Sequence, residues 1–338
     1  MSGTTDAPTP ERFFEAASAY QRTEALRTSV ELDLFSVVAA GHRTAGEIAQ
    51  HCKAHEKGVR VLCDFLVVAG FLRKESGRYE LSADSAMFLD RKSPAYMGGV
   101  LDFVHRPTLR QGYANLTAAV RKGGTALPAG GLMAEENTDW VQFARSMVPM
   151  MARPAQLCAQ LIERPADARL EVLDIAAGHG LFGIEVGKRF VQAQITGLDW
   201  SNVLEVAKEN ARHAGLAERY RTIAGDAFEV GLGHGYDVVL IPNFLHHFGV
   251  DRCVEFLRRV QHALKPDGIA LTVEFVPDEE RVSPPFPATF AMAMLVATEE
   301  GDAYTWSQLD GMFKRAGFRS SSLHPLAPSA EHAIVSLA

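Results

Sequence analysis

The first hundred residues have the spacing of amphipathic helices followed by a hairpin. Apolar residues recur at helical intervals over residues 13–38, which predicts one or two helices. Thr44 and Glu47 form a capping-box pattern at the start of the next helix. A third helix follows, and the pattern of residues 71–81 then predicts a β-hairpin. Helices that lead into a hairpin indicate a winged-helix domain over residues 1–100.

The middle of the chain is rich in glycine and other small residues before helical spacing returns. Trp140, Phe143, Met147 and Met151 follow one another at intervals typical of a helix. We therefore predict helical connecting structure over residues 101–160.

From residue 170 onward, short β-branched runs alternate with helical segments. This alternation is typical of βαβ units around a parallel sheet. The predicted strands occupy residues 171–175, 194–199, 220–223, 236–241, 268–276, 319–325 and 333–337. We expect an α/β domain over residues 161–338.

The chain has 338 residues, of which 47% are hydrophobic and 22% charged, and this length favours two globular domains. A formal net charge of −7 gives no general attraction for nucleic-acid phosphates or anionic lipid. The longest apolar stretch, residues 61–72, is well short of the ~20 residues that a transmembrane helix needs. The four cysteines lack the spacing of a zinc site, so no metal is expected. We expect a soluble, cytoplasmic protein with no nucleic-acid or membrane partner.

A glycine-rich loop follows the first strand of the predicted sheet. Gly178, Gly180 and Gly183 match the dinucleotide fingerprint, but glycines there suit a dinucleotide and an adenosyl sulfonium alike. Asp174 distinguishes between these two kinds of cofactor, because a carboxylate there would repel a pyrophosphate and attract the ammonium of a methionine moiety. This residue favours a cationic cofactor. The alternative is that Asp174 caps the following helix or belongs to a structural hydrogen-bond network.

Two further carboxylates follow the next two strands. Asp199 can accept hydrogen bonds from both hydroxyls of a ribose. Asp226 can receive an adenine amino group, and Phe228 lies either against the adenine ring or in the core. Because the carboxyl ends of parallel strands meet at one edge of the sheet, we expect the three carboxylates to cluster there.

These motifs resemble those of class I S-adenosylmethionine-dependent methyltransferases. The segments that carry the resemblance are residues 174–180, 199, 225–226 and the turn at 263–268. Residues 32–35 and 44–49 extend it, over nearly the whole chain, to the two-domain small-molecule O-methyltransferases, the acetylserotonin and caffeic acid group. One departure is Ala176, where the family usually has the first glycine of the loop.

The resemblance implies a fold, a cofactor and an assembly. The fold is a Rossmann-like, seven-stranded methyltransferase sheet with its last strand antiparallel, behind an N-terminal winged-helix dimerisation domain. The cofactor is S-adenosyl-L-methionine, which leaves as S-adenosyl-L-homocysteine. The chain would form a homodimer through residues 1–100, and the connector over residues 101–160 would line the active site.

The resemblance also assigns roles around two adjacent histidines. His246 corresponds to the general base that takes the proton from a substrate hydroxyl, and Glu274 to the residue that holds its imidazole. His247 is expected to bind substrate, although it could exchange roles with His246. Asn243 is expected to contact the cofactor. The alternative for His246 is a structural or substrate-binding role.

A second acidic residue of the family, before the final helix, corresponds to Ala303 in this chain. Its neighbour Asp302 could substitute for it. Plant members of the family also often have Asp at the position of His247. Because of these two differences, the substrates of the plant enzymes are not transferred to this chain.

The acceptor pocket is expected to be apolar. Phe290 and Met294 lie in a segment that lines it in the resembled enzymes, and Met147 and Met151 lie in the connector. Such side chains suit a flat aromatic substrate, and they also suit an ordinary core. The expected function is therefore O-methylation of a small, aromatic metabolite.

Three alternative functions remain. The same fold methylates carbon, nitrogen or sulfur, and the sequence defines the methyl donor better than the acceptor. A ligand-sensing DNA-binding regulator is disfavoured, since residues 1–100 contain 12 Lys or Arg and 13 Asp or Glu. An NAD-dependent dehydrogenase is disfavoured by Asp174 and by the Leu245–His246 pair.

Overall fold

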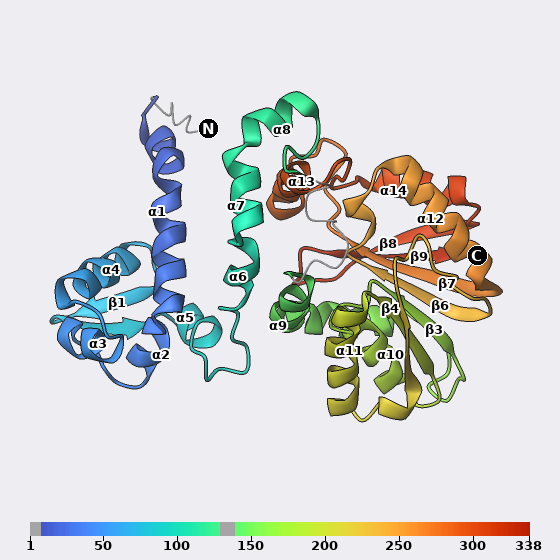
Figure 1. Cartoon of the computed structure of the whole chain (residues 1–338), viewed down its shortest axis with the longest axis horizontal. Helices are drawn as coiled ribbons and strands as arrows, with labels where there is room; N and C mark the ends of the chain where they lie inside the picture. Colours follow the sequence, from blue (N-terminus) through green and yellow to red (C-terminus); the bar gives the residue numbers. More distant parts are fainter. Residues whose placement is uncertain (1–7, 129–138) are drawn as a thin grey trace, which may run out of the picture. The chain divides into compact units, whose positions relative to one another are not determined.

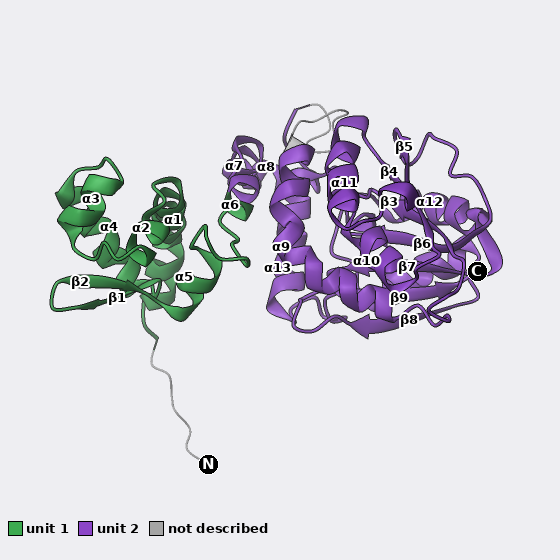
Figure 2. Cartoon of the chain, turned by 90° about the horizontal axis from the view of Figure 1, so that it is seen from below, with its two compact units in different colours: residues 1–101 green, residues 102–338 purple. Residues whose placement is uncertain are grey.

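The computed structural model of the chain describes residues 8–128 and 139–338 (Figure 1). They form two compact units, one reaching to Leu101 and the other beginning at Asp102 (Figure 2). The predicted connector over residues 101–160 falls within the second unit, and its status as a separate domain stays a prediction. Within the described ranges, no helix is both long enough and apolar enough to span a bilayer.

The first unit is a group of helices that carries a two-stranded hairpin. Its elements are α1 (Glu11–Glu31), α2 (Leu34–Ala39), α3 (Ala45–His51), α4 (Glu56–Val68), β1 (Leu72–Glu75), β2 (Arg78–Leu81) and α5 (Ala83–Phe88). The predicted capping box is present, because Thr44 Oγ1 accepts a hydrogen bond from Glu47 N and the Glu47 carboxylate accepts one from Thr44 N. Phe35, Ile48 and Tyr79 are almost fully buried in the shared core. The predicted helices and hairpin are confirmed.

A series of helices leads into the second unit. α6 (Val100–Val104) spans the boundary, and α7 (Pro107–Ala114), α8 (Leu116–Lys122) and α9 (Asp139–Gln160) follow. α7 and α8 pack against α13 (Pro285–Ala297), which comes much later in the chain (Figure 1). The contact is apolar and includes Leu109, Ala119, Val296 and Ala297.

Seven strands form one sheet in the second unit. They are β3 (Glu171–Ile175), β4 (Gln194–Asp199), β5 (Tyr220–Ala224), β6 (Tyr236–Pro242), β7 (Leu264–Glu274), β8 (Ser320–Pro325) and β9 (His332–Leu337). Their order is β5-β4-β3-β6-β7-β9-β8, and neighbours are parallel except that β9 runs antiparallel to both β7 and β8. The predicted α/β fold with an antiparallel last strand is confirmed. β7 begins at Leu264 and not at residue 268, because Leu264 already pairs with Tyr236 ahead of a shift in register.

Helices cover both faces of the sheet (Figure 1). α10 (Leu181–Arg189) and α11 (Ser201–His213) share one face with α9, while α12 (Val250–Ala263) and α14 (Trp306–Ala316) share the other. Successive side chains of a strand point to opposite faces, so one central strand supplies both cores. Val172 packs with α9, α10 and α11. Leu173 packs with α12 and α14.

A buried carboxyl group joins β3 to the helix after it. Asp174 is fully buried, and its Oδ2 accepts a hydrogen bond of 2.9 Å from the backbone N–H of Gly183, in the first turn of α10. The N-cap residue of α10 is Gly180, which has no side chain to make such a bond. A Cβ at Gly183 would lie 2.7 Å from Ile195 Cγ2 and 2.9 Å from Asp174 Oδ2. The helix therefore packs this closely on β3 and β4 because the residue is glycine.

We expect Gly183→Ala to lower the free energy of unfolding by about 1–3 kcal/mol, because the added methyl group overpacks a filled space. The matched control is Gly311→Ala in α14, where nothing lies within 4 Å of the added Cβ. The control should stabilise the protein by about 0.5–1 kcal/mol through helix propensity. Urea unfolding followed by circular dichroism measures both variants, and equal effects would contradict the close packing at Gly183.

A second prediction concerns the pH dependence of stability. Burial raises the pKa of Asp174 to about 8, from 3.8 for the unperturbed group. Between these values the folded protein holds a proton that the unfolded chain has released, so the free energy of unfolding falls by about 1.4 kcal/mol per pH unit for this group. Asp174→Asn keeps an acceptor for Gly183 and removes this dependence. Its stability relative to the wild type should therefore rise steadily from pH 5 to pH 8.

Urea unfolding at each pH measures this difference. Gly311→Ala, which removes no titratable group, serves as control and should follow the wild type at a constant offset. A constant offset for Asp174→Asn as well would show that the folded protein does not raise the pKa of Asp174.

Candidate active site

The loop after β3 turns sharply at three positions. Ala176, Gly178 and Gly180 have φ angles of +49°, +55° and +74°. This left-handed backbone suits glycine and strains alanine, which explains why the resembled family usually has glycine at the position of Ala176. A Cβ at Gly180 would also lie 2.9 Å from Tyr220 Oη on β5. Glycine at position 180 therefore lets the loop pack closely against Tyr220 on β5 and Ala207 on α11.

Asp199, at the end of β4, fastens this loop. Its Oδ2 accepts a hydrogen bond of 2.8 Å from Gly178 N, and its Oδ1 accepts one of 2.7 Å from Trp200 N. Burial raises the pKa of Asp199 to about 6, against the opposing effect of these two hydrogen bonds. The charge of Asp199 in turn helps to raise the pKa of Asp174. These two strand-end carboxyl groups lie close together, as predicted.

Asp174 fulfils the structural one of its two predicted alternatives, and its role toward a cofactor stays a prediction. Oδ2 caps α10, as the structural alternative expects. Oδ1 is buried and has no hydrogen-bond partner among the described residues. With its pKa raised to about 8, the group is largely protonated at neutral pH when no ligand is bound, whereas a bound ammonium group would favour the carboxylate and donate a hydrogen bond to Oδ1. The chemistry of this atom therefore fits the cationic end of S-adenosylmethionine.

The loop after β5 holds the third predicted carboxylate. Asp226 is half-buried, and its Oδ1 accepts a hydrogen bond of 2.8 Å from Phe228 N. The Phe228 ring packs against those of Phe244 and Phe248, with centroids 5.8 and 4.7 Å away, and the guanidinium of Arg252 lies over it at 4.3 Å. Of the two alternatives for Phe228, these contacts favour core packing.

His246 lies in a short 3-10 turn, η3 (Leu245–His247), beyond the end of β6. Its Nδ1 lies 2.6 Å from Glu274 Oε2, and both side chains are almost fully buried. Glu274 Oε1 accepts a hydrogen bond of 2.8 Å from Leu245 N, so the carboxylate also holds the turn. Because a carboxylate only accepts, Nδ1 carries the proton of the neutral imidazole and Nε2 is left as its basic atom.

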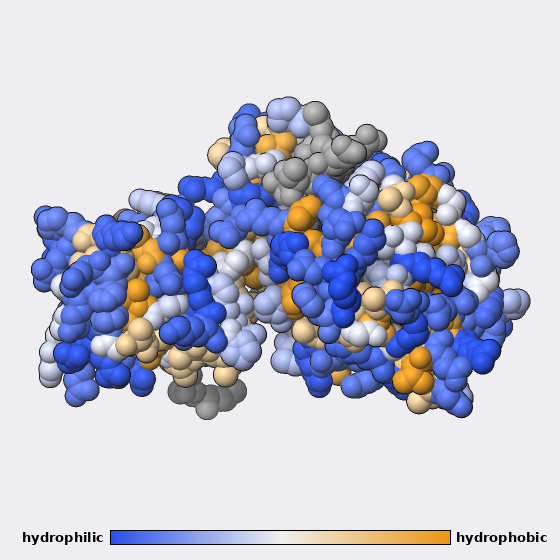
Figure 3. Space-filling view, turned by 60° about the horizontal axis from the view of Figure 1, so that its bottom comes forward, coloured by the Kyte–Doolittle hydropathy of each residue, from blue (hydrophilic) through white to orange (hydrophobic). Residues whose placement is uncertain are grey.

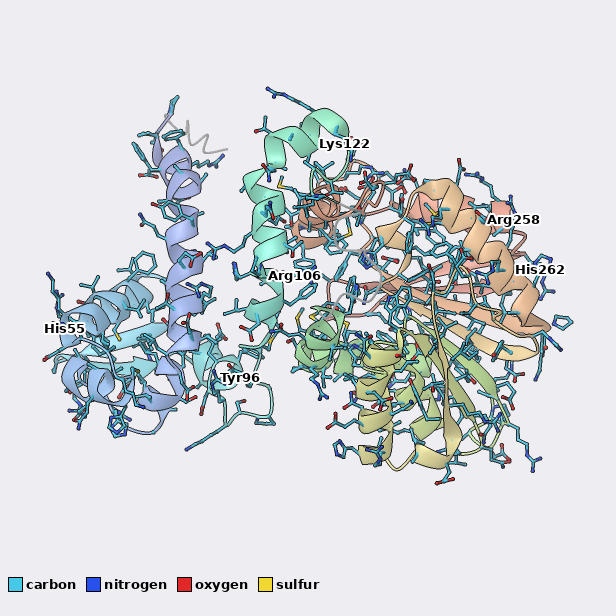
Figure 4. All side chains as sticks on the ribbon, viewed as in Figure 1. His55, Tyr96, Arg106, Lys122, Arg258 and His262 are labelled. Atoms are coloured by element: carbon cyan, nitrogen blue, oxygen red, sulfur yellow. The ribbon has the colours of Figure 1, made fainter. Side chains whose placement is uncertain are left out.

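His247 has a different environment. Its Nδ1 is buried without a hydrogen-bond partner among the described residues, and its ring lies 5.9 Å from that of Trp140. Burial, followed by the charges of His246 and Arg106, holds the pKa of His247 well below its usual range. Arg106, labelled in Figure 4 at the start of α7, is itself buried, with its guanidinium 3.8 Å from the centre of the Phe103 ring. His247 is therefore a neutral imidazole at neutral pH.

An aromatic cluster lies beside His246. The Phe290 ring contacts the His246 ring edge to face, with centroids 4.9 Å apart, and Phe275 lies 4.6 Å from Phe290. Phe286 joins them at 5.1 Å from Phe275 and is half exposed. The structure therefore brings Phe290 to the predicted base, and Phe275 and Phe286 are additions that the sequence analysis missed.

The three predicted methionines are placed less closely. Met151 Sδ lies 3.6 Å from Asn243 Nδ2, at the end of β6. Met147 is half-buried and packs with the cluster around α9, and Met294 is buried in α13. Met151 thus contacts the side chain of Asn243, another predicted site residue.

Asp302 does not replace the family's second acidic residue beside His246. Its carboxylate pairs with Arg281 Nη1 at 2.9 Å. Only its backbone N–H reaches the histidine, by donating a hydrogen bond of 3.0 Å to the carbonyl oxygen of His246. The possible substitution by Asp302 fails because Arg281 holds the side chain.

Glu331, between β8 and β9, was missed by the sequence analysis. It is 1% exposed, and its Oε1 accepts a hydrogen bond of 2.9 Å from Asn243 Nδ2. The signal in the sequence was an acidic residue directly before an apolar strand. A glutamate that is buried at such a position needs a partner, because glutamate is rarely buried without one. Among the described residues, no group of histidine, cysteine and acidic side chains could hold a metal ion.

Two family models match the chain. A model described as an O-methyltransferase domain matches residues 113–319, which is more than half of the chain. A model described as an O-methyltransferase dimerisation domain matches residues 14–91. Both matches agree with the two kinds of domain that the resemblance implies.

Relatives and solved structures are similar over almost the full length. A 3-hydroxy-5-methyl-1-naphthoate 3-O-methyltransferase of Streptomyces sahachiroi is 28% identical over 311 residues, which cover 91% of this chain and 89% of the relative. A Nostoc punctiforme PCC 73102 protein classed as an O-methyltransferase has 47% identity and a TM-score of 0.94, with 98% of this chain and 100% of that chain covered.

Human N-acetylserotonin methyltransferase, solved in complex with S-adenosylmethionine, shares the fold. Its TM-score is 0.84 at 22% identity, with 99% of each chain covered. The predicted enzyme class, an S-adenosylmethionine-dependent methyltransferase with an N-terminal dimerisation domain, is confirmed. The chain belongs to the O-methyltransferase family.

Proposed function

We propose that the chain methylates a hydroxyl group of a small aromatic metabolite, with His246 as the general base. The buried His246–Glu274 pair, with 2.6 Å between Nδ1 and Oε2, carries this proposal. It presents a neutral imidazole whose Nε2 can accept a proton. The naphthoate relative supports an aromatic acceptor through its name, and Phe290 beside His246 supplies an aromatic wall.

The acidities of the groups limit how the proton moves. A phenol titrates near ~10 and histidine near ~6.5, so full deprotonation before methyl transfer would cost about 5 kcal/mol. We infer that His246 takes the proton as the hydroxyl oxygen attacks. S-adenosylmethionine supplies the electrophilic methyl group. Glu274 keeps the proton on Nδ1 and stabilises the imidazolium that forms.

The polar groups at the carboxyl edge of the sheet suit the three parts of S-adenosylmethionine. We assign the adenine to Asp226, the ribose to Asp199, and the methionine end to the loop of Gly178 and Gly180. Asp174 Oδ1 and Asn243 Oδ1, both buried without a partner among the described residues, are acceptors for the ammonium group. Phe228 contributes packing around this edge.

The acceptor pocket is proposed to lie on the other side of His246. Phe275, Phe286 and Phe290 form its aromatic wall. Met151 contacts Asn243, and we propose that it also lines the pocket. His247 is proposed to bind substrate. It is disfavoured as the base, because no carboxylate among the described residues orients its ring.

We expect His246→Ala to lower kcat by a factor of about 10²–10⁴, because removal of a positioned base has this effect. The measurement is transfer of a labelled methyl group to a panel of hydroxylated naphthoates and phenols. His247→Ala is the matched control and should change KM more than kcat. Calorimetry should show that both variants bind S-adenosylhomocysteine as the wild type does, whereas Asp199→Ala should lose this binding.

Two outcomes would contradict the proposal. Full activity of His246→Ala together with loss of activity in His247→Ala would show that His247 is the base. Absence of S-adenosylhomocysteine binding in the wild type would remove the proposed cofactor.

We propose that the first unit mediates formation of a homodimer. Large apolar side chains are exposed on it, with Phe13 69%, Phe14 62% and Tyr20 65% exposed on α1. Val61 and Val68 on α4 are exposed as well, and Figure 3 shows hydrophobic surface among the hydrophilic residues of this unit. Apolar surface of this kind is typical of an interface. The dimerisation family model covers the same residues.

Replacement of Phe13 and Phe14 together by Glu should convert the dimer to a monomer, because the charges would be buried at the interface. Light scattering measures the molar mass, which should fall by half. The control is Val282→Glu, which puts one such charge on an exposed valine of the second unit and should leave the mass unchanged. An unchanged mass for the Phe13 and Phe14 variant would place the interface elsewhere.

We also propose a cytoplasmic location. All four cysteines are free thiols, and three of them, Cys63, Cys158 and Cys253, are buried. Unpaired thiols agree with a reducing compartment.

A further inference from the structure

Glu331 forms a buried carboxylate site between β8 and β9 that the proposed reaction does not use. Its Oε1 accepts a hydrogen bond of 2.9 Å from Asn243 Nδ2, and its Oε2 accepts one of 2.8 Å from Ser329 Oγ. Ser329 Oγ also accepts from Glu331 N at 3.3 Å, so the short turn holds the carboxylate in place. A buried carboxylate is costly unless such donors satisfy it, which indicates a specific use.

The partner of Glu331 is held rigidly as well. Asn243 adopts a left-handed backbone conformation, with φ +53°, directly after β6. Its backbone N–H donates a hydrogen bond of 2.8 Å to Val273 O on β7. Its Nδ2 faces Glu331, which as a carboxylate only accepts, so the other end of the carboxamide must be the acceptor Oδ1. Glu331 thereby determines that Asn243 offers an acceptor and not a donor.

The sheet places this acceptor beside the glycine loop. Asp174 on β3 pairs in register with Leu240 on β6, so Asn243, three residues later, lies level with Ala177 in the loop. In strand order, Asp226 follows β5, Asp199 ends β4, the loop follows β3, and Asn243 follows β6. With the adenine at Asp226 and the ribose at Asp199, the amino-acid end of the cofactor points toward β6.

We propose that Glu331 is a positioning residue that fixes the carboxamide of Asn243, so that Asn243 Oδ1 accepts a hydrogen bond from the amino group of S-adenosylmethionine. This inference rests on the proposed function. Oδ1 is buried without a partner among the described residues, and an ammonium group is the part of the amino-acid end that can donate to it. The carboxylate of the cofactor cannot donate, and the charge of Glu331 disfavours a second anion nearby.

Several titratable groups lie around Glu331. Burial and the charge of Glu274 raise its pKa, while the hydrogen bonds from Asn243 and Ser329 and the charge of His246 lower it. The Cys158 thiol on α9 also lies within electrostatic range. Because burial raises the pKa of Glu331, the binding experiment is run on the alkaline side of neutral pH, which favours the ionised carboxylate and so the defined orientation of the carboxamide.

The test uses calorimetry with two probes. One is S-adenosylhomocysteine, and the other is its analogue in which hydrogen replaces the amino group. Asn243→Gly, which suits the left-handed backbone, should weaken binding of S-adenosylhomocysteine about tenfold and leave the analogue unchanged. Glu331→Gln should weaken the same probe about threefold, because the carboxamide can then reverse. The double variant should bind no more weakly than Asn243→Gly, since the two residues act through one contact.

The controls distinguish a failure of this inference from a failure of the proposed cofactor. Glu218→Gln, at an exposed glutamate, should bind both probes as the wild type does. Unchanged binding of the analogue shows that a variant is folded, and Ser329→Ala gives a milder second variant, with a smaller loss confined to S-adenosylhomocysteine. Equal weakening of both probes by Asn243→Gly, or wild-type binding by Glu331→Gln, would overturn the inference. If the wild type binds neither probe, the proposed cofactor fails first.

Discussion

The hydrogen bond between His246 and Glu274 is the constraint on which the site depends. Glu274 ends β7, and His246 follows the neighbouring strand β6, so the pair exists only when these strands lie side by side. The same carboxylate accepts the N–H of Leu245 and so holds the 3-10 turn that carries the histidine. One side chain thus sets the position and the tautomer of the imidazole. The pairing of β6 with β7 therefore determines where the His246 imidazole lies and which of its nitrogens carries the proton.

Other polar groups of the site are also held in place by hydrogen bonds from neighbouring segments. The carboxyl groups near the ends of β3 and β4 are held by backbone N–H groups of neighbouring segments, Asp174 by Gly183 in α10 and Asp199 by Gly178 in the loop after β3. In Asp174 this bond leaves one carboxyl oxygen unused. Asp174 Oδ1 remains buried and open to a donor in the part of the chain that the structure describes. A ligand can therefore satisfy what the fold leaves incomplete.

Local patterns were enough to predict the strands and the glycine loop, whereas the pairing of His246 with Glu274, 28 positions away, was implied by the family resemblance. The strands and the loop depend on periodicity and on motifs within short segments. The side-chain partners were harder, because they depend on contacts between distant segments. Phe228 packs against three aromatic rings that come later in the chain, Asp302 is held by Arg281, and Glu331 meets Asn243 across 88 positions of sequence. Burial of a charge is decided by the tertiary structure, which no local pattern contains.

The groups assigned to the cofactor and the groups assigned to the acceptor lie on different elements of the fold. The groups assigned to the cofactor lie at strand ends and are held by backbone hydrogen bonds, so a substitution there disturbs the sheet or the helix that follows it. The aromatic wall is different, since Phe286 and Phe290 belong to α13, which packs against the helices α7 and α8. Under the proposed assignment, side chains on this helix can vary while Asp174 and Asp199 keep their places on the strands. A cofactor site held by the sheet, next to an acceptor wall carried by a helix, would then allow related chains to share one methyl donor and differ in their acceptors.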